Sequence, residues 1–89
     1  HLDAGASLAV QKSGVSLLAV GVSKVEGNFQ RGEVVSCISS DGNEIARGLV
    51  NYDSKESRQL QGMTSEKFES ILGYVDEAEL IHRDNLVLL

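Results

Sequence analysis

The sequence predicts an α+β fold, mostly β, in which short strands form a small barrel and short helices lie at its periphery. Three observations support this prediction. The 89 residues suffice for one domain only. Nine glycines divide the chain into short segments, and proline is absent. Those segments are either apolar, β-branched runs or short helical patterns with capping residues.

A helix is the first expected element. Asp3 can cap it, and it runs roughly to Lys12. We expect Gly14 to end this helix in the left-handed conformation. The apolar run Ser16 to Val25 then predicts one or two strands, with Gly21 as a kink or bulge.

The centre of the chain reads as turns and a hairpin. Gly27-Asn28 makes one turn, and Gly32 makes another. Residues 34–39 form a strand with apolar side chains on both faces, which suits a barrel wall. Asp41-Gly42 is a strong hairpin signal, and residues 45–52 form the returning strand.

The last third carries two short helices and a strand. Asp53 and Glu56 have the spacing of a capping box, which predicts a helix through residue 60. A second helix over residues 64–72 ends at Gly73. Residues 80–89 form a final strand that a polar run interrupts in its middle.

Composition narrows the classes of function. The net charge is −5, which argues against strong nonspecific binding to nucleic acid, although a local basic patch remains open. The single cysteine excludes an internal disulfide and predicts a reducing, cytoplasmic location. We see no signal peptide and no apolar run of membrane-spanning length, so no membrane partner is expected.

One glycine pattern invites a phosphate-binding interpretation. Residues 27–32 have the glycine spacing of such a loop, but Glu33 and Val34 replace the lysine and hydroxyl that it requires. A carboxylate there repels phosphate. The favoured interpretation is therefore two tight turns flanking a buried Phe29.

No metal or catalytic set is expected from the remaining reactive residues. His1, Cys37 and His82 lie far apart with no paired spacing, so the sequence predicts no metal site. Cys37 falls within an apolar strand, which indicates an inert core thiol. The polar run 82–85 suggests catalysis, but ion pairs or turn hydrogen bonds from Arg83 and Asp84 are favoured.

Several separated segments carry a family resemblance over essentially the whole chain. Residues 16–22, 25–29 and 31–35 closely resemble the PUA domain, the pseudouridine synthase and archaeosine transglycosylase module. A narrower resemblance is to the C-terminal region of the bacterial glutamate 5-kinase family, in residues 3–6, 44–52, 71–74 and 82–85.

This resemblance implies a PUA-like pseudo-barrel of about six strands with short peripheral helices. It implies that residues 1–89 are a single PUA domain of a larger kinase, whose N-terminal amino-acid-kinase domain is absent here. That family phosphorylates glutamate with ATP and magnesium in proline biosynthesis, and proline inhibits it. ATP and magnesium then belong to the kinase domain, so we expect no cofactor and no catalytic residue in this chain.

Other PUA proteins bind structured RNA through the first helix, its glycine loop and the adjoining strand. The resemblance implies an RNA-binding set of Lys12, Ser13, Gly14, Val15 and Ser16, with Lys24 as a neighbour. Two departures from the family stand out. Ala19 replaces a usual proline, and the strand before the first helix is reduced to His1-Leu2, leaving an edge that invites dimerisation or strand exchange.

Two functions therefore remain open. One is a regulatory or assembly module of a glutamate 5-kinase, with the kinase domain and further copies as partners. The other is an RNA-binding module. An independent small enzyme is disfavoured, because no motif indicates a complete catalytic set.

Overall fold

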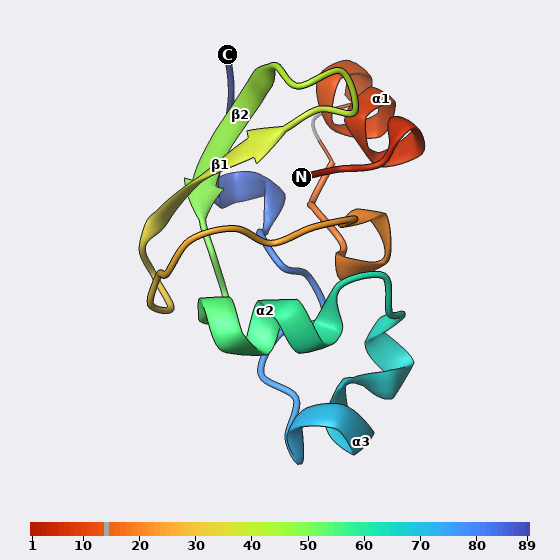
Figure 1. Cartoon of the computed structure of the whole chain (residues 1–89), viewed down its shortest axis with the longest axis vertical. Helices are drawn as coiled ribbons and strands as arrows, with labels where there is room; N and C mark the ends of the chain where they lie inside the picture. The colour runs from red at the N-terminus through yellow and green to blue at the C-terminus, as the bar shows by residue number, and fades with distance from the viewer. Residues whose placement is uncertain (14) are drawn as a thin grey trace.

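The computed structural model describes residues 1–13 and 15–89. These residues form one antiparallel sheet of three strands in the order β1-β2-β3, three α-helices and three short 3-10 turns. In Figure 1, α1 lies beside the β1–β2 hairpin at one end of the long axis, and α3 lies at the other end. The elements are α1 (Ala4–Ser13), β1 (Val34–Ile38), β2 (Glu44–Leu49), α2 (Ser54–Leu60), α3 (Phe68–Leu72) and β3 (Leu86–Leu88).

The first helix begins where the sequence predicts. The Asp3 carboxylate accepts a hydrogen bond from the backbone N–H of Ala6 at 2.8 Å, so Asp3 is the N-cap. Val10 is buried and anchors α1 to the core. The expected left-handed cap at Gly14 lies outside the described residues.

The prediction of strands over residues 16–25 is wrong. This segment forms a 3-10 turn, Ala19–Gly21, between two isolated bridges. Leu17 pairs with Ile81 and Val22 pairs with Leu2, so the two ends of the segment have different partners and the backbone bends between them. Gly21 lets this segment pack closely against α1, because a Cβ there would lie 2.5 Å from the Ala6 Cβ.

The hairpin prediction is confirmed. β1 and β2 pair from Val34 opposite Leu49 to Ile38 opposite Glu44, with one irregularity next to Ile38. Gly42 makes the turn with φ of +91°. β2 ends at Leu49, before the expected residue 52. Val50 N–H still bonds to the Glu33 carbonyl beside β1, but Asn51 N–H bonds to the Leu80 carbonyl, so the backbone leaves β1 there.

Both predicted helices of the last third are present. The capping box at α2 is complete: Glu56 N–H donates to the Asp53 carboxylate at 2.8 Å, and Asp53 N–H donates to the Glu56 carboxylate at 3.2 Å. The predicted second helix divides into a 3-10 turn, Ser65–Lys67, and α3. It ends at Gly73, whose φ is +83°.

The final segment is broken in its middle, as predicted. Ile81 bridges Leu17, a 3-10 turn covers Arg83–Asn85, and β3 follows. The described residues thus hold three strands and two isolated bridges, and the count of about six strands stays a prediction.

Aromatic packing fixes the end of the core near α3. Phe68 is fully buried and meets Tyr52 edge to face, with ring centroids 5.7 Å apart. The Tyr52 hydroxyl accepts a hydrogen bond from Glu77 N–H at 3.0 Å, which ties the segment after α3 to the core. Phe29, the other expected core aromatic, is half-buried against the same cluster. Within residues 1–13 and 15–89, no helix has the length and apolar character that a membrane crossing requires.

Candidate functional site

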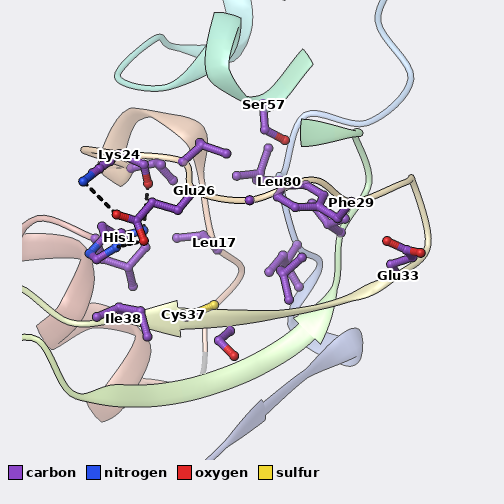
Figure 2. A pocket seen from close by; sticks show the side chains of 18 of the residues that line it. His1, Leu17, Lys24, Glu26, Phe29, Glu33, Cys37, Ile38, Ser57 and Leu80 are labelled. Carbon is purple, nitrogen blue, oxygen red and sulfur yellow. Dashed lines mark hydrogen bonds and ion pairs between the residues drawn. The ribbon is translucent and has the colours of Figure 1, made fainter. Parts of the chain in front are cut away.

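A cavity of about 440 Å³ opens between β1 and the segment of residues 22–29 (Figure 2). Its deeper wall is apolar because buried core residues from four parts of the chain line it: Leu17, Cys37, Val50, Leu80 and Ile81. Such a concave, mostly apolar space with a few polar groups at its rim is the usual form of a binding site.

Charged groups at one end of this cavity neutralise each other. Lys24 Nζ lies 2.7 Å from Glu26 Oε1, and His1 Nε2 lies 3.4 Å from the other oxygen (Figure 2). The hydrogen bond from Lys24 lowers the pKa of the Glu26 carboxyl, so this carboxyl is ionised at neutral pH. Glu33 lies at the opposite end, and the rim therefore offers no net positive charge to a phosphate.

Cys37 is the one thiol of the chain and faces this cavity. It is only 2% exposed, and burial raises its pKa to about 11. At neutral pH it is a protonated thiol and a poor nucleophile. The sequence prediction of an inert core thiol agrees with this environment.

A second hollow of about 330 Å³ lies against α1. Small residues of the helix, Gly5, Ala6 and Ala9, form one side, and the segment 15–21 forms the other. Val15, Leu18 and Val20 are partly exposed there. This surface is apolar, unlike the basic surfaces that bind phosphate backbones.

The predicted RNA-binding residues do not converge on one cavity. Lys12 is exposed in the last turn of α1 and lines neither hollow. Val15 and Ser16 line the hollow beside α1, whereas Lys24 lines the cavity beside β1.

The other two residues of the predicted RNA-binding set, Ser13 and Gly14, carry no basic side chain that could join Lys12. Ser13 is the last residue of α1, and Gly14 lies outside the described residues. RNA binding at this set stays a prediction.

The polar run 82–85 forms turn hydrogen bonds, as the favoured interpretation predicts. His82 Nδ1 accepts a hydrogen bond from Asp84 N–H at 3.1 Å, and Arg83 N–H donates to Ser16 Oγ at 2.9 Å. These contacts join the last part of the chain to the segment after α1. Among the residues that the structure describes, no three His, Cys, Asp or Glu side chains are grouped as a metal site would require.

One polar cluster was missed by the sequence reasoning. Arg31 donates to Asp76 Oδ2 and to the Tyr74 hydroxyl, each at 2.8 Å, and its guanidinium lies 5.8 Å from the Tyr52 ring centroid. The Tyr74 hydroxyl donates in turn to the Glu56 carboxylate, which raises the pKa of Tyr74. Arg31 lies 45 residues from Asp76 and 43 from Tyr74 in the sequence, so no local pattern could reveal the cluster.

The family model described as "PUA domain" matches residues 1–72. The chain belongs to the PUA domain family. A solved structure with a similar fold is a PUA domain from Aeropyrum pernix K1 in a tartrate complex. Its TM-score is 0.63 and its identity 23%, over 91% of this chain and 39% of that one.

Curated relatives confirm the narrower resemblance of this PUA domain. Glutamate 5-kinase from Hahella chejuensis is 61% identical over 88 residues, which cover 99% of this chain and 23% of that protein. Glutamate 5-kinase from Nitrosococcus oceani is 62% identical over 88 residues, or 99% of this chain and 24% of that protein. The PUA domain thus spans about a quarter of the length of these relatives.

Proposed function

We propose that this PUA domain is a non-catalytic module of a glutamate 5-kinase, with a regulatory or assembly role. The observation that carries the proposal is the 61–62% identity to such kinases across 99% of the chain. The parent protein would phosphorylate L-glutamate with ATP and magnesium in proline biosynthesis, in the cytoplasm. Residues 1–89 would be a single domain whose partners are the kinase domain and further copies of the kinase.

The chemistry of the chain supports a non-catalytic role. Its buried thiol is protonated at neutral pH, and its internal histidine is engaged in a turn. A thiol that stays protonated is a poor nucleophile. Catalysis is therefore assigned to the part of the kinase outside this domain.

Removing the domain from the full-length kinase tests this role. We expect kcat to be retained, whereas the proline concentration for half-inhibition, the magnesium requirement or the oligomeric mass changes. Phe68→Ala should reproduce part of that change, because losing a buried phenylalanine costs about 3–5 kcal/mol. Lys55→Ala, at an exposed position of α2, is the matched control. Unchanged inhibition, magnesium requirement and assembly after deletion would contradict the proposal.

RNA binding is the alternative function. The exposed Lys12, at the end of a helix beside a hollow that includes Val15 and Ser16, favours it. Binding of a fluorescent RNA hairpin at low salt, weakening as salt rises, would support it. Lys12→Glu should then weaken binding more than Lys24→Glu, because Lys24 is already paired with Glu26. No binding by the isolated domain at low salt would eliminate this function for it.

A further inference from the structure

The segment that follows α3 is an exposed strap between two fixed points. Residues 74–78 form neither helix nor strand, and each of their side chains is exposed. They lead from Gly73, which ends α3, back toward α2 (Figure 1). At the far end, the Asn51 side chain donates to the Glu79 carbonyl at 3.0 Å, and Asn51 N–H donates to the Leu80 carbonyl at 2.8 Å. The name strap is used below for residues 74–78.

Polar contacts hold the strap against a buried tyrosine. Tyr52 is fully buried, and its hydroxyl accepts hydrogen bonds from Asp76 N–H at 3.2 Å and Glu77 N–H at 3.0 Å. Val75 of the strap is 47% exposed, so the strap buries little apolar surface of its own. When the strap lifts, water replaces its bonds to the hydroxyl, so no buried polar group is left without a partner. Opening the strap therefore costs less free energy than unfolding the domain.

One arginine fastens the strap from outside. Arg31 donates to Asp76 Oδ2 and to the Tyr74 hydroxyl, each at 2.8 Å, and its guanidinium lies 5.9 Å from the Tyr74 ring centroid. The turn that carries Arg31 is held separately, because Gly32 N–H donates to the Val50 carbonyl at 2.8 Å. Arg31 is thus anchored to the body of the domain and reaches across to two residues of the strap.

These contacts are open to dissolved ions. The side chain of Arg31 is 46% exposed and that of its partner Asp76 is 44% exposed. Ions in solution screen the attraction between charges at such exposed positions, whereas they act far less on buried groups. Added salt therefore weakens the hold of Arg31 on the strap more than it weakens the packing of the core.

We propose that the strap opens while the rest of the domain stays folded, and that Arg31 is the latch that holds it closed. Opening brings the buried Tyr52 to solvent, so the ionic conditions set how often this tyrosine is uncovered. The strap lies beyond residues 1–72, the part of the chain that the PUA family model matches. The inference is independent of the proposed kinase role.

Amide hydrogen exchange followed by NMR tests the latch. The reporters are the N–H groups of Asp76 and Glu77, which bond to the Tyr52 hydroxyl. The reference is the N–H of the buried Leu17, which lies outside the strap. Arg31→Met keeps an unbranched stem and removes the guanidinium. In this variant we expect exchange at the two reporters to be at least about fivefold faster and exchange at the reference to be unchanged.

A matched variant and a salt series separate the latch from a general loss of charge. Arg47→Met removes another exposed guanidinium, which pairs with Glu44 on β2. It should leave exchange at the strap unchanged. Raising NaCl from about 20 mM to about 500 mM should speed exchange at the strap, relative to Leu17, in the unaltered chain. The same change should have no such effect in Arg31→Met, where the charge that salt screens is absent.

Three results would overturn the proposal. The first is equal exchange at the strap in the unaltered chain and in folded Arg31→Met. The second is an equal acceleration at the strap and at Leu17, which would mean that the strap opens only when the whole domain unfolds. The third is exchange at the strap that does not respond to salt relative to Leu17 in the unaltered chain. This last result decides the case even if Arg31→Met does not fold.

Discussion

Gly48 is a position where the surrounding atoms leave no room for a side chain. It lies in β2 between Val35 of β1 and Leu86 of β3, and it is buried. A Cβ at this position would lie 2.7 Å from the backbone oxygen of Asn85 and 2.7 Å from Ile81 Cγ2. We therefore predict that Gly48→Ala destabilises the domain.

The size of the effect follows from those distances. An ordinary contact begins at 3.4 Å, so the atoms must separate by at least 0.7 Å, the difference from 2.7 Å. The Asn85 oxygen belongs to the backbone and cannot rotate away, so β3 must shift from β2. Overpacking of this kind costs about 1–3 kcal/mol. For a domain of this size each kcal/mol lowers Tm by roughly 4–8 °C, so we expect a loss of about 4–24 °C.

Urea and thermal unfolding followed by circular dichroism measure this effect. Gly5→Ala is the control, because Gly5 lies in α1 and a Cβ there would meet only Asp3 Oδ1, at an ordinary contact distance of 3.6 Å. Alanine favours a helix over glycine by up to about 1 kcal/mol, so this variant should be as stable as the parent or more stable. Equal stability of Gly48→Ala and the parent would refute the packing argument.

Three further predictions concern single side chains. Asp53→Ala removes one half of the α2 capping box and should lower the free energy of unfolding in urea by about 0.5–2 kcal/mol. Glu66→Ala, at an exposed position, is the control, and an equal loss of stability in both variants would count against the cap. Burial raises the Cys37 pKa from an ordinary 9.0 to about 11. The contribution of the buried thiol to the free energy of unfolding is therefore complete below pH 9 and is lost as the pH rises toward 11. If the stability of a Cys37→Ala variant fell equally steeply with pH over that window, the thiol would not be the cause. The hydrogen bond from Arg47 holds the Glu44 pKa at about 2. The contribution of the Glu44 carboxylate to stability is therefore present above pH 4.5 and is lost as the pH falls toward 2. Arg47→Gln should move the titration midpoint of the Glu44 carboxyl, followed by NMR, toward 4.5, and a midpoint that stays near 2 would contradict a role for Arg47.

Local signals in the sequence predicted local structure well. The Asp3 cap, the Asp41-Gly42 hairpin and the Asp53–Glu56 capping box each depend on residues at most three positions apart, and each is present. A hydrogen bond between near neighbours leaves a pattern in the sequence that a single chain can show.

Long-range pairing was beyond those signals. The run 16–25 has the composition of a strand, yet its ends bond to Ile81 and Leu2, and a tight turn separates them. The composition of a segment reflects how buried its side chains are and what shape they have. Whether the segment forms a long strand depends instead on whether another backbone segment pairs with it along its length. The Arg31 cluster escaped notice for the same reason, since its members meet only after the chain has folded.

The candidate site shows the same division. Sequence reasoning anticipated the Cys37 environment and the turn at residues 82–85. It did not foresee that Lys24 pairs with Glu26, because a dispersed lysine carries no mark of its partner in space. The cavity beside β1 likewise depends on segments that lie far apart in the sequence.

The most direct test of the central claim is an assay of ATP-dependent glutamate phosphorylation with three proteins side by side: the full-length kinase, the kinase without these residues and the isolated PUA domain. The account predicts that the truncated kinase keeps the chemical step and that the isolated domain shows none. Phosphorylation by the isolated domain, or loss of the chemical step in a folded truncated kinase, would contradict the account.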